Sequence, residues 1–146
     1  MRALFAGSFD PFTRGHQSIV DRTLDSVADE VIIAIGVNYR KKCMFSLDER
    51  MSVIKRLYSK NPRVKVLSYE GLTTDFAKEV EADCLVRGVR SLHDFEYERN
   101  IADVNRRLTG IETILLFTEP ELSCVSSSNV RELLSYGKDV TQFLPR

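Results

Sequence analysis

The sequence predicts an α/β fold: a single doubly wound, Rossmann-like domain over residues 1–146, with a five-stranded parallel sheet and helices on both faces. Three observations lead to this prediction. Apolar runs and amphipathic helical patterns alternate along the whole chain, as they do in successive βαβ units. The apolar runs lack the alternation of a sheet that is wetted on one face. At 146 residues the chain has the size of one domain with a substantial core.

The expected strands are the five continuous apolar runs, and we expect all of them to be buried. They cover residues 3–6, 31–35, 64–67, 84–86 and 114–117. Each run is as long as a buried parallel strand and shorter than a typical helix. The connections between them are long enough for helical crossovers, so the strands are expected to be parallel.

Helical patterns fill the gaps between the runs. The inner faces are Ile19, Val20, Thr23, Leu24 and Val27 in the first helix, Leu47, Met51, Ile54 and Tyr58 in the second, and Tyr97, Ile101, Val104 and Leu108 in the fourth. Ser46 and Glu49 form a capping box before the second helix. The third helix, 74–81, is short, the fourth covers 94–108, and the fifth is capped by Ser126 or Ser127 and closed by Gly137.

The segment 7–16, Gly-Ser-Phe-Asp-Pro-Phe-Thr-Arg-Gly-His, joins the first strand to the first helix. Such a turn brings backbone N–H groups and a helix N-terminus to the carboxyl end of a strand, where a phosphate fits. The hydroxyl of Ser8 and the imidazole of His16 can face the same anion. Neither a Walker loop nor GxGxxG is present. The plainer alternative is that Gly7 and Gly15 only shape a tight turn while His16 packs against the helix.

Polar side chains follow the other four expected strands as well. They are Lys41 after the second strand, Thr73 after the third, Arg87 and Arg90 after the fourth, and Ser126 to Ser128 after the fifth. Because ligands of open α/β sheets bind at the carboxyl ends of the strands, these residues are predicted to converge. Two guanidinium groups can hold two different phosphates. Taken alone, the run 40–42 is more typical of a solvated loop than of a binding site, and the serines are equally typical of helix capping.

Composition excludes several classes of function. Lys plus Arg equals Asp plus Glu at 21 each, so no basic field indicates a nucleic-acid partner. Cys43, Cys84 and Cys124 form neither CxxC nor a zinc pattern, which is typical of a reduced, cytoplasmic protein. No apolar run predicts a membrane span or a signal peptide. There is no HExxH and no Ser-His-acid arrangement at nucleophile-elbow spacing, and we predict no metal ligands among the side chains.

The residues of the first turn resemble a known signature. T-x-G-H after G-S-F-D-P is similar to the motif of the nucleotidylyltransferase superfamily, with Thr13 in place of a first histidine. Three further blocks follow in order: K-K-C-M-F-S-L-D-E-R at 41–50, R-G-V-R-S-L-H-D-F-E-Y-E at 87–98 and S-S-S-N-V-R-E at 126–132. With all four blocks the chain resembles the bacterial phosphopantetheine adenylyltransferase family over essentially its whole length.

That resemblance implies an enzyme of coenzyme A biosynthesis, at the penultimate step. It would transfer AMP from ATP to 4'-phosphopantetheine with Mg²⁺ as cofactor, giving dephospho-CoA and pyrophosphate. The attacking phosphate is already an anion, so the reaction needs positioning and charge neutralisation rather than a covalent enzyme intermediate. The resemblance also implies a homohexamer and coenzyme A as a feedback inhibitor.

Residue roles follow from the same resemblance. The implied catalytic residues are His16, Lys41 and Arg90, and the implied phosphopantetheine-binding residues are Ser8, Lys41, Thr73 and Arg87. The implied ATP-binding residues are Ser8, Phe9, His16, Gly88, Val89, Arg90, Glu98, Ser123, Cys124, Val125, Ser126, Ser127, Ser128 and Asn129.

Two other functions stay open at the level of sequence. A nucleotidylyltransferase acting on nicotinate mononucleotide or glycerol phosphate would share the segment 7–16 but would not need the later blocks. A non-catalytic sensor of ATP or coenzyme A would share the fold, because a fold alone does not establish activity. Such a sensor would have no need of His16.

Overall fold

The computed structural model describes residues 1–146 and contains one five-stranded, fully parallel sheet. Its strands are β1 (Arg2–Gly7), β2 (Glu30–Val37), β3 (Val64–Glu70), β4 (Cys84–Val89) and β5 (Glu112–Phe117). The order across the sheet is β3-β2-β1-β4-β5, so the chain winds outward from β1 to one edge and then returns to the other side of β1. The predicted doubly wound sheet is therefore confirmed, with its switch point between β1 and β4.

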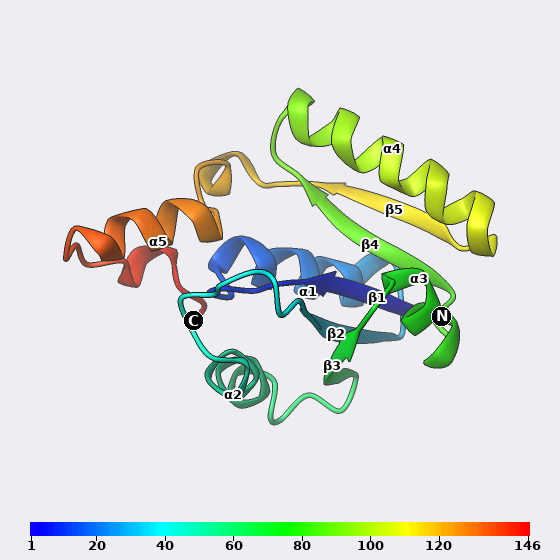
Figure 1. Cartoon of the computed structure of the whole chain (residues 1–146), viewed down its shortest axis with the longest axis horizontal. Helices are drawn as coiled ribbons and strands as arrows, with labels where there is room; N and C mark the ends of the chain where they lie inside the picture. Colours follow the sequence, from blue (N-terminus) through cyan, green and yellow to red (C-terminus); the bar gives the residue numbers. More distant parts are fainter.

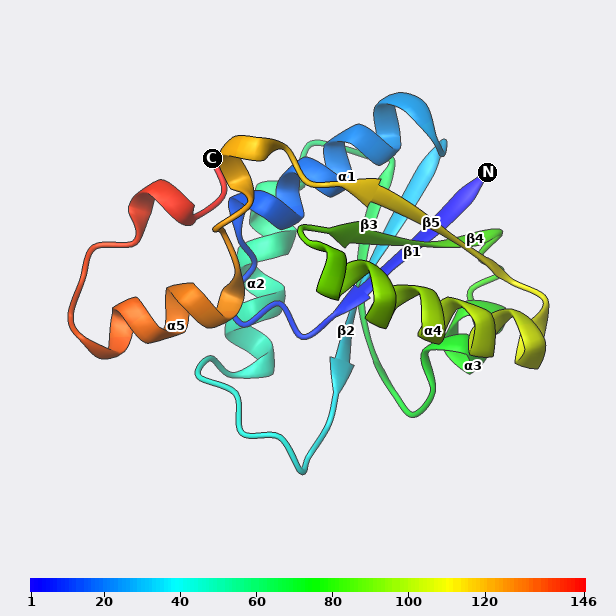
Figure 2. The same ribbon diagram turned by 90° about the horizontal axis from the view of Figure 1, so that it is seen from above.

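Helices cover both faces of the sheet, as predicted (Figures 1 and 2). They are α1 (Arg14–Ser26), α2 (Leu47–Leu57), α3 (Thr73–Glu79), α4 (Leu92–Thr109) and α5 (Ser127–Ser135), with short 3₁₀ turns at Pro120–Leu122 and Thr141–Phe143. Helices α1 and α2 pack on one face, and α3 and α4 lie on the other. Figure 1 shows α5 beyond the sheet, at the end of the molecule away from the N-terminus.

The core has two parts because successive strand residues point to opposite faces. Ala3 and Phe5 of β1 pack with the helices α1 and α2, in the larger cluster of buried side chains. Leu4 and Ala6 pack with Phe76 of α3 in the smaller cluster. The central strand is thus buried on both sides, which gives the turn that follows it a rigid base.

The prediction that all five strands are buried is only partly confirmed. The strands β1, β2 and β4 are largely buried, whereas β3 and β5 are half-exposed. Leu67 of β3 is 38% exposed and Phe117 at the end of β5 is 74% exposed. These strands form the two edges of the sheet, so each has a neighbouring strand on one side only.

The prediction that α4 buries its apolar stripe is wrong. Its side chains are exposed: Tyr97 at 60%, Ile101 at 38%, Val104 at 55% and Leu108 at 61%. The only buried residue of the helix is Glu98. The helical periodicity is right, but Val104 and Leu108 are exposed, while Tyr97 and Ile101 line an open cavity between the helix and the sheet. Periodicity shows that a helix has an apolar side and does not show what covers it.

The predicted caps of α2 and α5 are confirmed, whereas α3 ends at Glu79 rather than at residue 81 and α4 begins at Leu92 rather than at residue 94. Ser46 and Glu49 form the capping box of α2, Ser126 is the N-cap of α5, and Gly137 follows α5 with a φ of 71°, a left-handed conformation that glycine adopts without strain. None of the helices combines the length and the apolar character needed to cross a membrane.

Candidate active site

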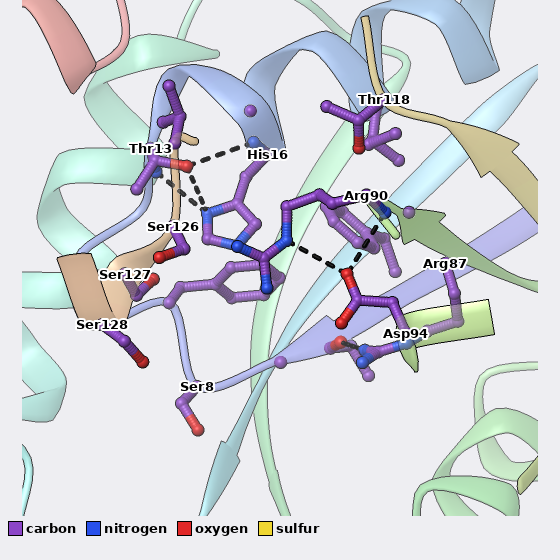
Figure 3. A pocket seen from close by; sticks show the side chains of 18 of the residues that line it. Ser8, Thr13, His16, Arg87, Arg90, Asp94, Thr118, Ser126, Ser127 and Ser128 are labelled. Carbon is purple, nitrogen blue, oxygen red and sulfur yellow. Dashed lines mark hydrogen bonds and ion pairs between the residues drawn. The ribbon is translucent and has the colours of Figure 1, made fainter. Parts of the chain in front are cut away.

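A cavity of about 310 Å³ opens at the carboxyl end of the sheet, beside the switch point. Its lining includes the polar residues that the sequence places after the strands: Ser8, His16, Lys41, Arg87, Arg90, Ser126, Ser127 and Ser128. Figure 3 shows the serine hydroxyls, the His16 ring and the Arg90 side chain around one hollow. The predicted convergence of these residues is confirmed, although they come from four separate parts of the chain.

Thr13 holds the His16 ring in place (Figure 3). The backbone N–H of Thr13 donates to His16 Nδ1 at 2.9 Å, and Thr13 Oγ1 caps the helix by accepting from the His16 N–H. Because Nδ1 accepts a hydrogen bond, the proton of the neutral ring is on Nε2. His16 therefore enters the cavity as a donor with a defined orientation. Thr13, which stands in place of the first histidine of the superfamily motif, provides that orientation.

Aromatic side chains surround His16 and keep it neutral. The ring centroids of Phe5, Phe9 and Phe12 lie 6.1, 5.0 and 5.3 Å from that of His16. Burial among them, together with the charges of Arg87 and Arg90, lowers the pKa of His16 from its ordinary value of 6.5 to about 3. The imidazole is consequently uncharged at neutral pH and can donate one hydrogen bond without carrying a positive charge.

Phe9 has a strained backbone in this turn. Its φ is 48°, in the left-handed region that a bulky side chain rarely adopts. The side chain is 3% exposed and packs against Phe5 and Phe12. Burial of the ring offsets the backbone cost, and the resulting tight turn brings Ser8 to the mouth of the cavity.

Arg87 lies within β4 rather than after it, which corrects the expected strand end at residue 86. Its guanidinium donates to both carboxylate oxygens of Glu98, at 2.9 Å each, and to the carbonyl of Ala6. Burial alone would lower the pKa of Arg87, but the Glu98 carboxylate outweighs that effect and raises it. Arg87 is thus a permanently charged group that two neighbours hold in one orientation.

Arg90 directly follows β4 and is held more loosely. Its Nε donates to Asp94 Oδ2 at 3.2 Å, and no protein partner is within hydrogen-bond distance of its terminal nitrogens. Those nitrogens supply forked donors to an anion in the cavity. The two arginines, close in sequence, therefore differ in how much of their hydrogen-bonding capacity is free.

Lys41 and the first turn of α5 complete the polar lining. Lys41 Nζ lies 3.2 Å from Ser8 Oγ, so the exposed loop after β2 brings its ammonium group to the Ser8 turn. At α5, Ser126 Oγ accepts from the Asn129 N–H and Ser127 Oγ donates to the Pro11 carbonyl. The first N–H groups of a helix have no partner within it and carry partial positive charge. This end of the cavity is suited to a polyphosphate.

A second cavity, of about 420 Å³, adjoins the first and shares Ser8, Lys41, Arg87 and Glu98 with it. It extends between β1, β4 and α4, and its further lining is mixed apolar and polar: Leu4, Tyr69, Thr73, Leu85, Tyr97, Ile101, Asn105 and Thr113. The hydroxyl groups of Thr73 and Tyr69 form a hydrogen bond of 2.7 Å. The second cavity therefore suits a longer ligand with amide and alkyl groups and an anionic end at Arg87 and Lys41.

Not every residue of the implied ATP set lines the cavities. Phe9, Gly88, Glu98 and Val125 do, whereas Val89, Ser123, Cys124 and Asn129 do not. Gly88 allows α1 to approach closely, since a Cβ there would meet two Ile19 side-chain carbons at 3.1 Å. Asn129 Nδ2 donates to the Cys124 carbonyl and shapes the segment before α5.

Sequence reasoning missed Asp94, Thr118 and Arg131, which also line the first cavity. Arg131 donates to Ser128 Oγ at 3.2 Å and to the carbonyl of Asp10 at 2.8 Å. Asp94 and Arg131 both lie inside the motif blocks that carry the family resemblance. Their charged side chains within those blocks are the signal that the sequence offers. The contact from Arg131 to the Asp10 carbonyl is long-range and arises only from packing.

The side chains of the site do not fit a protein-held Mg²⁺. The only carboxylates that line the two cavities are Asp94 and Glu98, and both form ion pairs with arginines. The chain has no cluster of three or more His, Cys, Asp or Glu side chains placed to hold a metal ion. Mg²⁺ prefers several oxygen ligands at close range, and the side chains that line the two cavities do not supply them.

Comparison with known proteins agrees with the geometry. The cytidylyltransferase-like family matches residues 4–133. A phosphopantetheine adenylyltransferase of Bacteroides thetaiotaomicron is 59% identical over 144 residues, covering 99% of this chain and 95% of the relative. Proteins of the same name from Porphyromonas gingivalis and Flavobacterium psychrophilum are 56% and 49% identical, over 98% and 99% of this chain and 93% and 95% of the relatives.

The fold is also found in a solved structure. A lipopolysaccharide core biosynthesis protein from Thermoplasma volcanium superposes with a TM-score of 0.57 at 19% identity, over 82% of this chain and 96% of that one. At that identity the likeness concerns the fold alone. The sequence relatives are far closer, and with the family match and the arrangement of the motif residues they lead to one conclusion: the chain belongs to the phosphopantetheine adenylyltransferase family of cytidylyltransferase-like proteins.

Proposed function

We propose that this chain is an adenylyltransferase that moves AMP from ATP to 4'-phosphopantetheine, giving dephospho-CoA and pyrophosphate. The observation that carries the proposal is the meeting of two different cavities at Ser8, Lys41 and Arg87. One cavity is polar and rich in cations and hydroxyls, and the other is partly apolar. A nucleotide triphosphate and a phosphorylated acceptor with an amide-containing arm match these two halves.

The reaction follows from how the two ligands would meet. With ATP phosphates at Arg90 and the first turn of α5, the acceptor phosphate lies at Lys41 and Arg87. An acceptor phosphate oxygen attacks the α-phosphorus of ATP, a new P–O–P link forms, the bond to the β-phosphate breaks, and pyrophosphate leaves. The nucleophile is an anion already, so no general base is required, and the cations reduce the repulsion between two phosphates.

His16 supplies a hydrogen bond where charge develops. Its neutral Nε2–H group can donate to a non-bridging oxygen of the α-phosphate, since Nδ1 is already bonded to Thr13. A donor placed at developing negative charge is worth about 3 kcal/mol, roughly a hundredfold in rate. His16, Lys41 and Arg90 are accordingly the residues to which we assign catalysis.

Further elements of the proposal concern partners and setting. Mg²⁺ would accompany ATP and be held by its phosphate oxygens, because the site carboxylates are already paired. Coenzyme A contains the same pantetheine arm as the acceptor, so it is proposed to bind the second cavity as an inhibitor.

We place the enzyme in the cytoplasm, as its three free cysteines suggest. A homo-oligomer, hexameric as in the family resemblance, is supported by the apolar stripe on α4.

Pyrophosphate release in the presence of ATP tests the acceptor. We expect turnover with 4'-phosphopantetheine and none above background with nicotinate mononucleotide or glycerol 3-phosphate. The partly apolar second cavity explains the selectivity, because the shorter acceptors leave it unfilled. Turnover with either alternative acceptor, and none with 4'-phosphopantetheine, would remove the proposed substrate.

His16→Ala separates an enzyme from a nucleotide sensor. We expect kcat to fall by about a hundredfold or more while the Kd for ATP changes less than about threefold, since the lost hydrogen bond forms mainly in the transition state. His93→Ala is the matched control, because His93 is the only other histidine and is exposed on α4. If affinity and rate fell equally in His16→Ala, the residue would be a binding residue instead.

A further inference from the structure

Asp10 is a buried carboxylate that lies next to the active site and has no role in the chemistry described above. It is 2% exposed. Its Oδ2 accepts from the backbone N–H of Met44 and its Oδ1 from that of Phe45, both at 2.9 Å. These two amides are at the end of the loop that follows β2, far from Asp10 in sequence. Asp10 thus joins the Ser8 turn to the loop that carries Lys41.

Arg50 makes the complementary half of this junction. It is 8% exposed, and its guanidinium donates to the carbonyls of Phe45, Ser46 and Ser8 at 3.1, 3.3 and 2.8 Å. No carboxylate lies within ion-pair distance of it. Asp10 therefore holds backbone N–H groups, Arg50 holds backbone carbonyls, and both act across the same two segments. Charged groups at such low exposure are costly unless each is fully hydrogen-bonded.

The loop between β2 and Met44 has few other constraints, and the main one is the Tyr39 hydroxyl, which donates to Glu70 Oε1 at 2.6 Å. Residues 38–42 are exposed. Its internal hydrogen bonds join the N–H groups of Arg40 and Lys41 to Asn38, at 3.0 Å each. The ammonium group of Lys41 reaches Ser8 Oγ over 3.2 Å. The position of Lys41 relative to Ser8 thus depends on how firmly the far end of the loop is held at Met44 and Phe45.

We propose that Asp10 is a positioning residue, which keeps Lys41 beside Ser8 by holding the backbone amides of Met44 and Phe45. The inference rests on the proposed function, because Lys41 is taken to bind the acceptor phosphate there. Asp10 itself lines neither of the two cavities. The contact from Arg131 Nη1 to the Asp10 carbonyl, at 2.8 Å, ties the same turn to α5. The contacts of Asp10 with the Lys41 loop and with Arg131 therefore align the acceptor side of the site with the nucleotide side.

A double-mutant cycle with Asp10→Asn and Lys41→Ala tests the proposal. The asparagine offers one acceptor oxygen and turns an N–H₂ group toward a backbone N–H, so one amide is released. We expect kcat/KM for 4'-phosphopantetheine to fall about tenfold or more when Lys41 is present and less than about twofold in the Lys41→Ala background. Asp48→Asn is the matched control, since Asp48 is an exposed carboxylate on α2.

Hydrogen exchange supplies a readout besides activity. In Asp10→Asn the amides of residues 44–45 are expected to exchange faster, while those of α1 and β4 keep their protection. Equal fold-losses with and without Lys41, or unchanged exchange at 44–45, would overturn the proposal. If Asp10→Asn does not fold, the same cycle with Asp10→Ser, whose single hydroxyl replaces the two carboxylate oxygens, decides between the same two outcomes. A wild-type chain that is inactive with 4'-phosphopantetheine would instead refute the proposed function.

Discussion

Arg87 and Arg90 are neighbours in the sequence, yet their surroundings give them different capacities. Both carboxylate oxygens of Glu98 and the Ala6 carbonyl hold the Arg87 guanidinium, and it borders both cavities. Arg90 borders only the first cavity, and its terminal nitrogens are free. At the scale of single residues, hydrogen-bond partners rather than residue type decide what an arginine contributes.

The two arginines should therefore fail differently when removed. We expect Arg90→Ala to raise the KM for ATP about tenfold or more and Arg87→Ala to do the same for 4'-phosphopantetheine, because each loses charge-assisted hydrogen bonds to one phosphate. Initial rates with each substrate varied in turn measure both effects. Arg107→Ala, at an exposed site on α4, serves as the control. Equal changes in both KM values for either variant would contradict the assignment.

At the scale of elements, α4 is the helix whose burial is incomplete in a single chain. The buried Glu98 points to the site, while Tyr97, Val104 and Leu108 are more than half exposed. Figure 2 shows α4 along the sheet beside β5. A regular apolar stripe exposed to water is costly and marks an interaction surface, which is why the proposed homo-oligomer is placed there.

A charge on this stripe should separate the subunits. We expect Val104→Glu to lower the molar mass measured by light scattering after gel filtration, because it would place a carboxylate in the proposed interface. The midpoint of thermal unfolding of the separated chain should change little, since Val104 is 55% exposed. Val53→Glu is the matched control: the same substitution on α2, at a residue 41% exposed. Unchanged mass in Val104→Glu would exclude α4 as the interface.

At the scale of the whole molecule, the same packing that stabilises the fold keeps His16 neutral. The ring lies against Phe5, Phe9 and Phe12, and all three phenylalanines belong to the larger buried cluster. Protonating His16 would place a positive charge in that environment, near two arginines. The stability of the fold and the protonation state of the site are therefore linked.

That linkage has a definite sign. The folded-state pKa of His16 is about 3 and the ordinary value is 6.5, so between these values the unfolded chain binds the extra proton and stability falls as pH falls. Because of His16, we expect the free energy of unfolding at about pH 5 to be about 2 kcal/mol lower than at about pH 7. Urea unfolding at about pH 7 and about pH 5 measures it. His16→Asn should lose less stability over this interval, and His93→Asn should behave as wild type. An identical loss in His16→Asn would contradict the linkage.

Much of the fold and part of the site were accessible from the sequence, because they depend on local rules. Apolar runs and helical periodicity identified the five strands and the inner faces of α1 and α2. Cap chemistry located Ser46 at the start of α2. The convergence of Ser8, Lys41 and Arg90 followed from one topological rule about strand ends.

The tertiary structure alone decided which distant groups meet. It left Val104 and Leu108 of α4 exposed, paired Arg87 with Glu98, and brought the Asp10 carboxylate to the amides of Met44 and Phe45. Sequence periodicity reports that a side chain favours burial or a partner, but it does not name the partner, because contacts between remote segments arise only when the whole chain packs. The sequence by itself therefore determined the elements and the set of reactive groups, and packing decided their orientation and their pairs.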